Sequence, residues 1–350
     1  MINVFRKEID EMNDTTYLLT GAAGFLGSHI CKQLLEKGEH VKAFVLKNDP
    51  AKKYIPSNVE IFEGNLCSLE DCMNFFEVNT TYSVCIHCAS LVTVNPSYSE
   101  KLMCVNVDGT DNIIKCCKAN PNCKKLVYVS STGAIPELPK GTKIKEVKHF
   151  YPYDDDLVIG WYSKSKAIAT QHVLDAAKEG LNACVVHPSG ILGPEDNAIG
   201  TTTKTIIDIL NGKMPIGMKG SFNLADVRDL AYGTIAAVEK GRKGECYILA
   251  NEEVTLKEMC KILDNEVHCG KPKIYLSLKF AKKIARRQEK KAKKTHKQPL
   301  MTTFSVYNLE RNNAYDYSKA TKELGYNPRP YVETLRDEAK WLKEKEKLNK

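Results

Sequence analysis

The chain has 350 residues, 43% of them hydrophobic, so it can bury either one large α/β core or a larger domain with a smaller second lobe, which we favour. Its formal net charge of +8 is concentrated in residues 279–297, which hold ten Lys or Arg and one Glu; without a recognition motif or interleaved aromatic residues, nucleic-acid binding is not expected. The first seventeen residues lack an apolar core and no later segment has eighteen uninterrupted apolar residues, which predicts neither an export signal nor a membrane span.

Residues 17–37 predict a strand, a sharp turn and a helix in succession. The apolar residues 17–20 are typical of a buried strand, and three glycines follow at a spacing of three. In dinucleotide-binding folds such glycines make the turn, let the main chain approach a diphosphate, and let helix and strand pack closely. Phosphates bind at the positive end of the helix, so the predicted phosphate-binding residues are Gly21, Gly24, Phe25, Leu26 and Gly27. The alternative is a glycine-rich turn without a ligand.

The second predicted strand, residues 41–46, ends where such folds select their cofactor. An acidic residue there binds the adenosine ribose of NAD, whereas a basic one accepts the phosphate of NADP. No acid is present here; Lys47 follows the strand, and Lys52 and Lys53 lie nearby. This favours NADP(H), with Lys47 as the phosphate contact, and leaves NAD(H) as the alternative.

Further strands are predicted at residues 59–62, 83–89, 125–129 and 181–187, and helices at 69–78 and about 98–118. The chain has thirteen cysteines, many of them in such apolar runs, which without a secretion signal predicts reduced, buried thiols and a cytoplasmic protein. Cys85 and Cys88 have the spacing of a zinc pair, but alternate side chains of a strand point to opposite faces and no second pair completes four ligands. We therefore predict no metal site.

The middle of the chain carries side chains that suit a carbonyl reduction. Residues 125–129 deliver Ser130 and Ser131 to the carboxyl edge of the sheet, where ligands collect. Tyr162 and Lys166 lie four apart, on one face of a helix that begins at Trp161. A free phenol, with a pKa of about 10, is a poor proton donor at neutral pH, and we expect the Lys166 charge, together with that of an oxidised nicotinamide, to lower that pKa. A serine hydroxyl would stabilise the substrate oxygen.

The order of these motifs points to a known family. The glycine turn comes first, then Asn106-Val-Asp-Gly-Thr-Asp-Asn, then the serine pair, and Tyr162 stands 31 residues after Ser131. This series resembles the extended branch of the short-chain dehydrogenase/reductase superfamily, the NAD-dependent epimerases and dehydratases, over residues 16–342. The resemblance implies a Rossmann-type, doubly wound parallel α/β sheet with a smaller carboxyl-terminal α/β substrate lobe.

The resemblance also implies roles for individual residues. The catalytic set is Ser131, Tyr162 and Lys166, with Asn106 positioning the lysine through water. Asn65 stands where relatives contact the adenine, although an Asn turn is an equal alternative. The expected cofactor contacts beyond the glycine turn and Lys47 are Asn65, Leu66, Cys88, Ala89, Ser90, Ser130, Tyr162, Lys166, Pro188, Gly190 and Ile191. The expected substrate contacts are Ser131, Thr132, Gly133 and Tyr162.

We divide the chain into three parts. Residues 1–16 form an N-terminal extension. Residues 17–190, joined by 223–250, form the dinucleotide-binding domain. Residues 191–222 and 251–345 form the substrate lobe, which includes a basic amphipathic helix at 274–297. Its outer face is either simply solvated or makes a weak contact with an anionic membrane surface through residues 279–297.

The expected reaction follows from what stands beside the serine pair. Sugar-nucleotide dehydratases carry two acids there, whereas Thr132, Gly133 and Ala134 follow here. Residues 187–194 look closer to dihydroflavonol-reductase-like and 3β-hydroxysteroid-dehydrogenase-like proteins. We therefore expect an enzyme that interconverts a ketone or aldehyde and its alcohol on a moderately apolar small molecule, as a homodimer by analogy with the family. The alternatives are a nucleotide-sugar epimerase or reductase, and a non-catalytic NAD(P)-sensing module.

Overall fold

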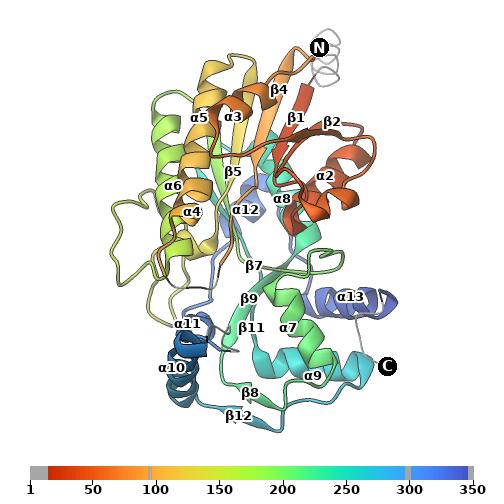
Figure 1. Ribbon diagram of the computed structural model, residues 1–350, viewed down its shortest axis with the longest axis vertical. Coiled ribbons are helices and arrows are strands. Elements are labelled where there is room, and N and C mark those ends of the chain that lie inside the picture. The colour runs from red at the N-terminus through yellow and green to blue at the C-terminus, as the bar shows by residue number, and fades with distance from the viewer. Residues whose placement is uncertain (1–14, 94, 96, 296–300, 346–350) are drawn as a thin grey trace.

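The centre of the computed structural model, which describes residues 15–93, 95, 97–295 and 301–345, is a parallel sheet of seven strands (Figure 1). The strand order is β3–β2–β1–β4–β5–β6–β10. The strands are β1 (Thr15–Thr20), β2 (His40–Val45), β3 (Glu60–Glu63), β4 (Tyr82–His87), β5 (Cys123–Val129), β6 (Ala183–Pro188) and β10 (Cys246–Leu249). The sheet is doubly wound, as predicted. The order in which the chain adds its parallel strands reverses between β1 and β4, and folds of this class bind ligands at such a point.

Helices cover both faces of this sheet. On one face lie α2 (Phe25–Glu36), α8 (Val227–Lys240) and α12 (Ser318–Leu324), and on the other lie α3 (Leu69–Phe75), α5 (Gly109–Ala119) and α6 (Trp161–Lys178) (Figure 1). Alternation along β1 builds both cores, because Tyr17 and Leu19 pack toward α2 while Leu18 packs toward the opposite face. Two short turns, η1 (Pro50–Tyr54) and η3 (Thr132–Ala134), follow β2 and β5.

The helix predicted at about 98–118 is present but irregular. It consists of α4 (Glu100–Met103), a π-helical turn η2 (Cys104–Asp108) and then α5. Asn106 lies in the middle of the π turn and is 1% exposed. Such turns are rare and often occur at functional sites, so the irregularity marks this residue.

A second lobe lies below the main sheet in the view of Figure 1. It contains a three-stranded sheet, β11–β9–β7, and a two-stranded sheet, β12–β8. Its strands are β7 (Gly190–Leu192), β8 (Ile216–Met218), β9 (Ser221–Asp226), β11 (Glu253–Thr255) and β12 (Ile274–Leu276). Its helices are α7 (Thr201–Leu210), α9 (Leu256–Val267), α10 (Leu278–Thr295), α11 (Thr303–Glu310) and α13 (Tyr331–Glu344). A separate apolar core joins α7, α9 and α13.

The chain passes between the main sheet and the second lobe at other residues than the sequence predicts. β9 belongs to the three-stranded sheet, so the chain returns to the main sheet only at α8. In the carboxyl-terminal segment, α12 packs on α8 and contributes Ala320 and Leu324 to the core of the main sheet. Of the predicted extension, residues 1–16, only Thr15 and Thr16 lie within the described residues, and they begin β1.

The basic helix predicted at 274–297 is shorter than expected. Residues 274–276 form β12, whose Ile274 and Leu276 pair with Ile216 and Met218 of β8, and the helix itself begins at Leu278. The prediction is wrong for these three residues because an isoleucine, a tyrosine and a leucine in succession suit a strand when a partner strand is near. Residues 296 and 297 lie outside the described residues.

The expectation that every cysteine is reduced is also wrong. Cys67 and Cys104 form a disulfide, with Cα atoms 5.9 Å apart, and the other cysteines are free. The two positions are 37 residues apart, and they meet because the loop after β3 lies against the start of α5, where Asn112 Nδ2 donates to Leu66 O at 2.9 Å.

Among the residues that the structure describes, no helix is both long and apolar enough to cross a membrane. Within the same residues, no three His, Cys, Asp or Glu side chains lie together as a metal site would require. The cytoplasmic location and the homodimer stay predictions.

Candidate active site

The turn between β1 and α2 has no room for side chains at its glycines. Gly21 has a φ of +76°, and a Cβ there would lie 2.7 Å from the backbone nitrogen of Ala89. A Cβ on Gly27 would lie 2.0 Å from the carbonyl oxygen of Gly21, so helix and strand approach closely only because this residue is glycine. Gly24 is the N-cap of α2 and provides no capping side chain. The main chain at the positive end of α2 is thus shaped as a diphosphate requires.

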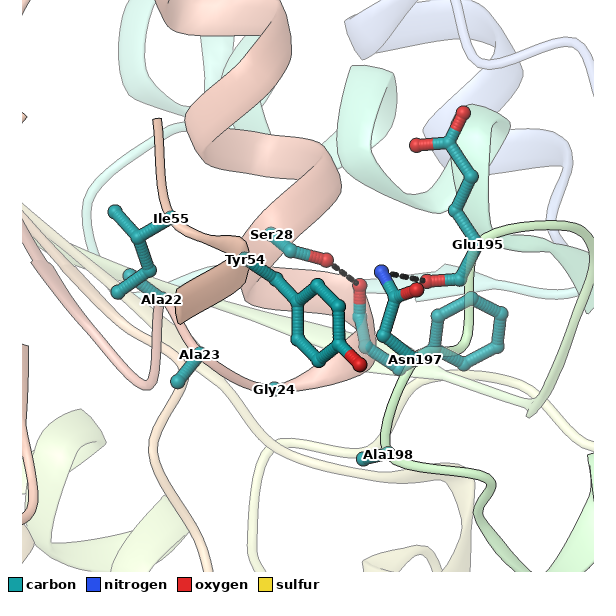
Figure 2. A pocket seen from close by; sticks show the side chains of 10 residues that line it. Ala22, Ala23, Gly24, Ser28, Tyr54, Ile55, Glu195, Asn197 and Ala198 are labelled. Carbon is teal, nitrogen blue, oxygen red and sulfur yellow. Dashed lines mark hydrogen bonds between the residues drawn. The ribbon is translucent and has the colours of Figure 1, made fainter. Parts of the chain in front are cut away.

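A pocket lies directly over this turn (Figure 2). The turn supplies one wall, while Tyr54 and Ile55 after η1 and the segment 195–198 supply the others. Of the predicted phosphate contacts, Gly24 and Phe25 line the pocket, whereas Leu26 is 4% exposed and packs in the core. Sequence reasoning missed the walls, which are Tyr54, Ile55, Glu195, Asn197 and Ala198.

An ion pair and a hydrogen bond hold the segment 193–199 against α2. Lys32 forms an ion pair with Glu195 at 3.1 Å, and the His29 ring donates to the carbonyl oxygen of Pro194 at 3.1 Å. Glu195 and Ile199 both have positive φ angles, 70° and 53°, which non-glycine residues rarely adopt. The chain therefore holds this segment in an uncommon conformation beside the pocket.

The lysines expected near the adenosine differ in their surroundings. Lys47 is exposed after β2. Lys52 forms an ion pair with Glu63 of β3, and the Lys53 ammonium lies 5.0 Å from the centre of the Tyr54 ring. Lys47 therefore keeps the better access to a ligand phosphate.

Asn65, the expected adenine contact, uses its side chain within the loop. Its Oδ1 accepts from the Cys67 amide at 3.0 Å, which is the Asn turn that we gave as the alternative. Leu66 is 7% exposed and packs under the same loop. These contacts do not direct the side chain of Asn65 or that of Leu66 toward the glycine turn.

A buried chain of hydrogen bonds supports the exit of β4, where Cys88, Ala89 and Ser90 follow the strand. The Thr20 hydroxyl accepts from the amides of Cys88 and Ala89, both at 3.1 Å, and is hydrogen-bonded to His87 Nδ1 at 2.7 Å. His87 Nε2 contacts the Thr110 hydroxyl at 3.1 Å, which in turn donates to the Asn106 carbonyl at 2.7 Å. Burial lowers the pKa of His87 to about 3, so this ring is neutral.

The Asn106 side chain contacts main chain and the Ser165 hydroxyl, and its expected role in positioning Lys166 through water stays a prediction. Its Oδ1 accepts from the Leu91 amide at 2.7 Å, and its Nδ2 donates to the Leu91 carbonyl at 3.1 Å and to the Ser165 hydroxyl at 3.0 Å. The Ser165 hydroxyl donates to the Tyr162 carbonyl at 2.8 Å. Asn106 thereby ties the segment after Ser90 to the first turn of α6.

The two serines after β5 have different partners. Ser130 is 5% exposed and its hydroxyl is bonded to that of Thr170 at 2.7 Å, inside the protein. The Ser131 hydroxyl accepts from the Gly133 amide at 3.0 Å and lies beside the Tyr162 phenol. The Ser131 carbonyl accepts from His187 Nδ1 at 3.0 Å, so a neutral buried histidine supports the serine from behind.

Two further expected substrate contacts face the protein interior. Thr132 is 6% exposed, and a Cβ on Gly133 would lie 3.0 Å from the Ser163 hydroxyl of α6.

Three of the expected cofactor contacts lie at the junction of two sheets. Pro188 ends β6, and Gly190 and Ile191 begin β7, so these three stand where the chain passes from the seven-stranded sheet to the three-stranded sheet.

Tyr162 has hydroxyl partners on two other segments. Its phenol lies beside the hydroxyls of Ser131 and Ser90. Burial raises the pKa of Tyr162, while the interaction with these two hydroxyls acts in the opposite direction, and desolvation outweighs it in this structure. The lowered pKa that we expect involves the Lys166 charge together with that of a bound oxidised nicotinamide, and it stays a prediction.

Lys166 points to β5. Its Nζ donates to the Val129 carbonyl at 2.8 Å and to the Tyr128 phenol at 3.3 Å, and the residue is 2% exposed. Burial lowers the pKa of Lys166 to about 8. The structure thus brings Ser131, Ser90 and Tyr162 together, with the Lys166 amine buried one helical turn further on.

Comparison with known proteins places this geometry in context. The model of the family described as "NAD dependent epimerase/dehydratase family" matches residues 17–250. A relative called sterol demethylase protein B, from Methylococcus capsulatus, is 26% identical and covers 94% of this chain and 99% of its own. A putative dihydroflavonol 4-reductase from Synechocystis sp. is 29% identical and covers 93% of this chain and 94% of its own.

Two further matches extend over most of the chain. The sterol-4-alpha-carboxylate 3-dehydrogenase erg26 of Schizosaccharomyces pombe, described as decarboxylating, is 28% identical over 89% of this chain and 92% of its own. The crystal structure of gox2253 superposes with a TM-score of 0.81 at 28% identity, covering 96% of this chain and 100% of that one. The similarity therefore includes the second lobe as well as the sheet.

Proposed function

The chain belongs to the NAD dependent epimerase/dehydratase family, and on that premise we propose that it interconverts a ketone or aldehyde and its alcohol on a moderately apolar small molecule. More coarsely, the protein is an NAD(P)-dependent oxidoreductase of the short-chain dehydrogenase/reductase superfamily that acts on a CH–OH group. The observation that carries the finer proposal is the position of the buried Tyr162 phenol beside the hydroxyls of Ser131 and Ser90.

Each residue in this arrangement has a task in the proposed reaction. A bound nicotinamide cofactor would supply or accept the hydride. In the direction of reduction, Ser131 donates a hydrogen bond to the substrate oxygen, and Tyr162 donates its proton to the same atom. Burial raises the pKa of Tyr162, so the phenol carries its proton before the reaction. The Lys166 ammonium, together with the charge of the oxidised nicotinamide, would stabilise the phenolate that remains and so make Tyr162 a better donor.

The residues also fit the cofactor that the family implies. The glycine turn lacks the Cβ atoms that would fill its cradle, and Gly24 and Phe25 line the pocket above it. These residues would hold the diphosphate, and the exit of β4 at Ala89 would lie against the ribose. Relatives named for sterols and for dihydroflavonol support an apolar ring compound as the substrate class.

The proposal is tested by replacing Tyr162 with Phe, which removes only the donated proton. A panel of ketones, steroids, flavonoid-type compounds and sugar nucleotides is screened for absorbance change with NADPH and NADH, and the variant is assayed on the substrate found. We expect turnover to fall ~10²- to 10⁴-fold with cofactor binding unchanged. The matched control is Tyr232→Phe, on the exposed surface of α8.

Two results would contradict the proposal. Turnover with sugar nucleotides alone would favour an epimerase or reductase of nucleotide sugars. Undiminished activity of the Tyr162→Phe variant would remove the phenol from the chemistry.

We propose NADP(H) as the preferred cofactor, with Lys47 as the contact for its additional phosphate. Lys52 is engaged by Glu63 and the Lys53 ammonium lies 5.0 Å from the centre of the Tyr54 ring, whereas Lys47 is exposed beyond β2 without an ion pair among the described residues. The Lys47→Asp variant should lower the preference for NADPH over NADH, measured as the ratio of kcat/KM values, by about tenfold or more. Lys243→Asp, an exposed position in the turn before β10, should leave that ratio unchanged. An equal ratio in wild type and Lys47→Asp would assign the preference to other residues.

A further inference from the structure

The helix α10 buries one face against α11. Ala281 and Ala285 are both 0% exposed and form a small apolar cluster with Val306 of α11. The short side chains let the two helices approach closely. The side of α10 that faces the protein is thereby fixed.

The charges of α10 that lie toward α11 are paired. Glu289, the only acid in the helix, accepts from the amide of Thr303 at 2.7 Å and from its hydroxyl at 2.9 Å. Lys282 forms an ion pair with Glu310 at the end of α11. The carboxylate of Glu289 is therefore engaged in hydrogen bonds within the lobe.

The opposite face of α10 carries only positive charge. At 100° per residue, six exposed basic residues fall on one side of the helix, away from Ala281 and Ala285, and none forms an ion pair with a described residue. They are Lys279, Lys283, Arg286, Arg287, Lys290 and Lys291. Phe280 lies on the same side, three residues before Lys283, and is 53% exposed.

A second pair of exposed apolar side chains lies at the same end of the lobe. Ile216 and Ile274 are register partners in β8 and β12, and they are 50% and 60% exposed. Figure 1 shows β8, β12 and α10 together at the end of the molecule farthest from the N-terminal strands. A single exposed apolar residue is ordinary, but three at the same end of the lobe as six unpaired cations give this end both characters.

We propose that this surface, the outer face of α10 with Phe280, Ile216 and Ile274, docks on an anionic phospholipid bilayer. The cations match the negative potential of such a surface, and the apolar side chains match the boundary between headgroups and acyl chains. A soluble polyanion matches the charges alone and leaves the exposed apolar residues without a role.

Docking through α10 would place the substrate side of the enzyme near the bilayer. Phe304 of α11 packs on Gly160, where a Cβ would lie 2.6 Å from the Phe304 ring, and Gly160 caps the helix that carries Tyr162. Tyr307 of α11 is hydrogen-bonded to Glu137 in the long loop after Ser131. A bilayer-borne apolar substrate would thus enter beside α11. This last step rests on the proposed function, whereas the docking itself does not.

Sedimentation of the full chain with vesicles tests the docking without any substrate. The vesicles are phosphatidylcholine with and without phosphatidylserine. We expect binding only with phosphatidylserine, and its loss at high salt. The triple variant Lys283→Gln, Arg287→Gln, Lys290→Gln should bind ~100-fold more weakly, since each basic residue near such a surface contributes roughly fivefold. Phe280→Ser, which keeps every charge, should weaken binding about tenfold.

A charge-matched control separates this surface from general basicity. Lys140→Gln, Lys243→Gln and Lys257→Gln remove three exposed charges outside α10 and should leave vesicle binding unchanged. Equal loss in the control, or binding to heparin without binding to vesicles, would overturn the proposal. Because the assay contains no substrate, failure of the proposed reaction and failure of docking are observed separately.

Discussion

The helices α6 and α10 are both 18 residues long and both carry lysines, yet they use them in opposite ways. α6 buries Lys166 against β5, where its ammonium donates to the Val129 carbonyl and the Tyr128 phenol. α10 turns its unpaired cations outward and directs Ala281, Ala285 and the paired carboxylate of Glu289 toward α11. The difference teaches that the packing partner, not the residue type, decides whether a lysine is a buried reactive group or part of an attractive surface.

The largest expected effect comes from removing the buried charge of α6. Lys166→Met should reduce turnover by at least ~10²-fold, because the phenolate of Tyr162 loses its stabilising ammonium. Its effect on stability has a definite sign. The pKa of Lys166 is lowered from 10.5 to about 8 in the folded protein, so the unfolded chain binds more protons between these values and stability rises with pH across that window.

Urea unfolding of both proteins from pH 7 to 10.5 measures this contribution. Wild type should gain stability relative to Lys166→Met above pH 8, up to roughly 3 kcal/mol, since each pKa unit corresponds to about 1.4 kcal/mol. Lys178→Met, at the exposed end of the same helix, should show neither effect. Parallel pH profiles for wild type and Lys166→Met would mean that the amine is not desolvated.

The comparison also shows which parts of the site were predictable from sequence. The glycine turn, the serine pair and the Tyr162–Lys166 spacing are local patterns, and the geometry of a strand, a turn or one helical face fixes them. Strands that alternate with helices are typical of a parallel sheet, and the family resemblance implies its doubly wound form. The family resemblance and the fold class are confirmed.

The rest depends on segments that meet only in the folded chain. Nothing near Tyr54 or Asn197 in the sequence indicates that they face each other across the glycine turn. The raised pKa of Tyr162 depends on how much water the folded protein removes, which the spacing of Tyr162 and Lys166 does not indicate. The Cys67–Cys104 disulfide likewise depends on one loop lying against one helix.

A second buried charge, in the other lobe, sharpens the comparison with an acid in place of a lysine. Glu338 of α13 is 0% exposed, and its Oε2 accepts from the Gly193 amide at 3.1 Å, at the start of the segment beside the pocket. Burial raises the pKa of Glu338 to about 8, and the nearby Asp196 adds to the shift. Folded protein therefore keeps this proton where the unfolded chain has lost it, and stability falls as pH rises from about 4.5 to about 8.

Glu338→Gln should abolish that loss while keeping an oxygen for the Gly193 amide. We expect the variant to match wild type near pH 4.5 and to exceed its unfolding free energy by a few kcal/mol at pH 8. Thermal unfolding across this range measures the difference. Glu333→Gln, an exposed acid of the same helix, provides the control. A wild-type advantage at pH 8 would show that the carboxylate is charged and paired in the folded state.

The smallest effects should separate the two faces of α10 itself. Glu289→Ala removes the acceptor for the amide and hydroxyl of Thr303 at the start of α11, and should lower the unfolding free energy by ~1–2 kcal/mol. Lys283→Ala, six positions earlier on the outer face, has no paired group to leave behind and should change it by less than about 0.5 kcal/mol. Chemical denaturation of both variants in the same buffer is the measurement. If Lys283→Ala were the more damaging of the two, the outer face would be held by contacts within the protein, and its cations would not be free to meet a bilayer.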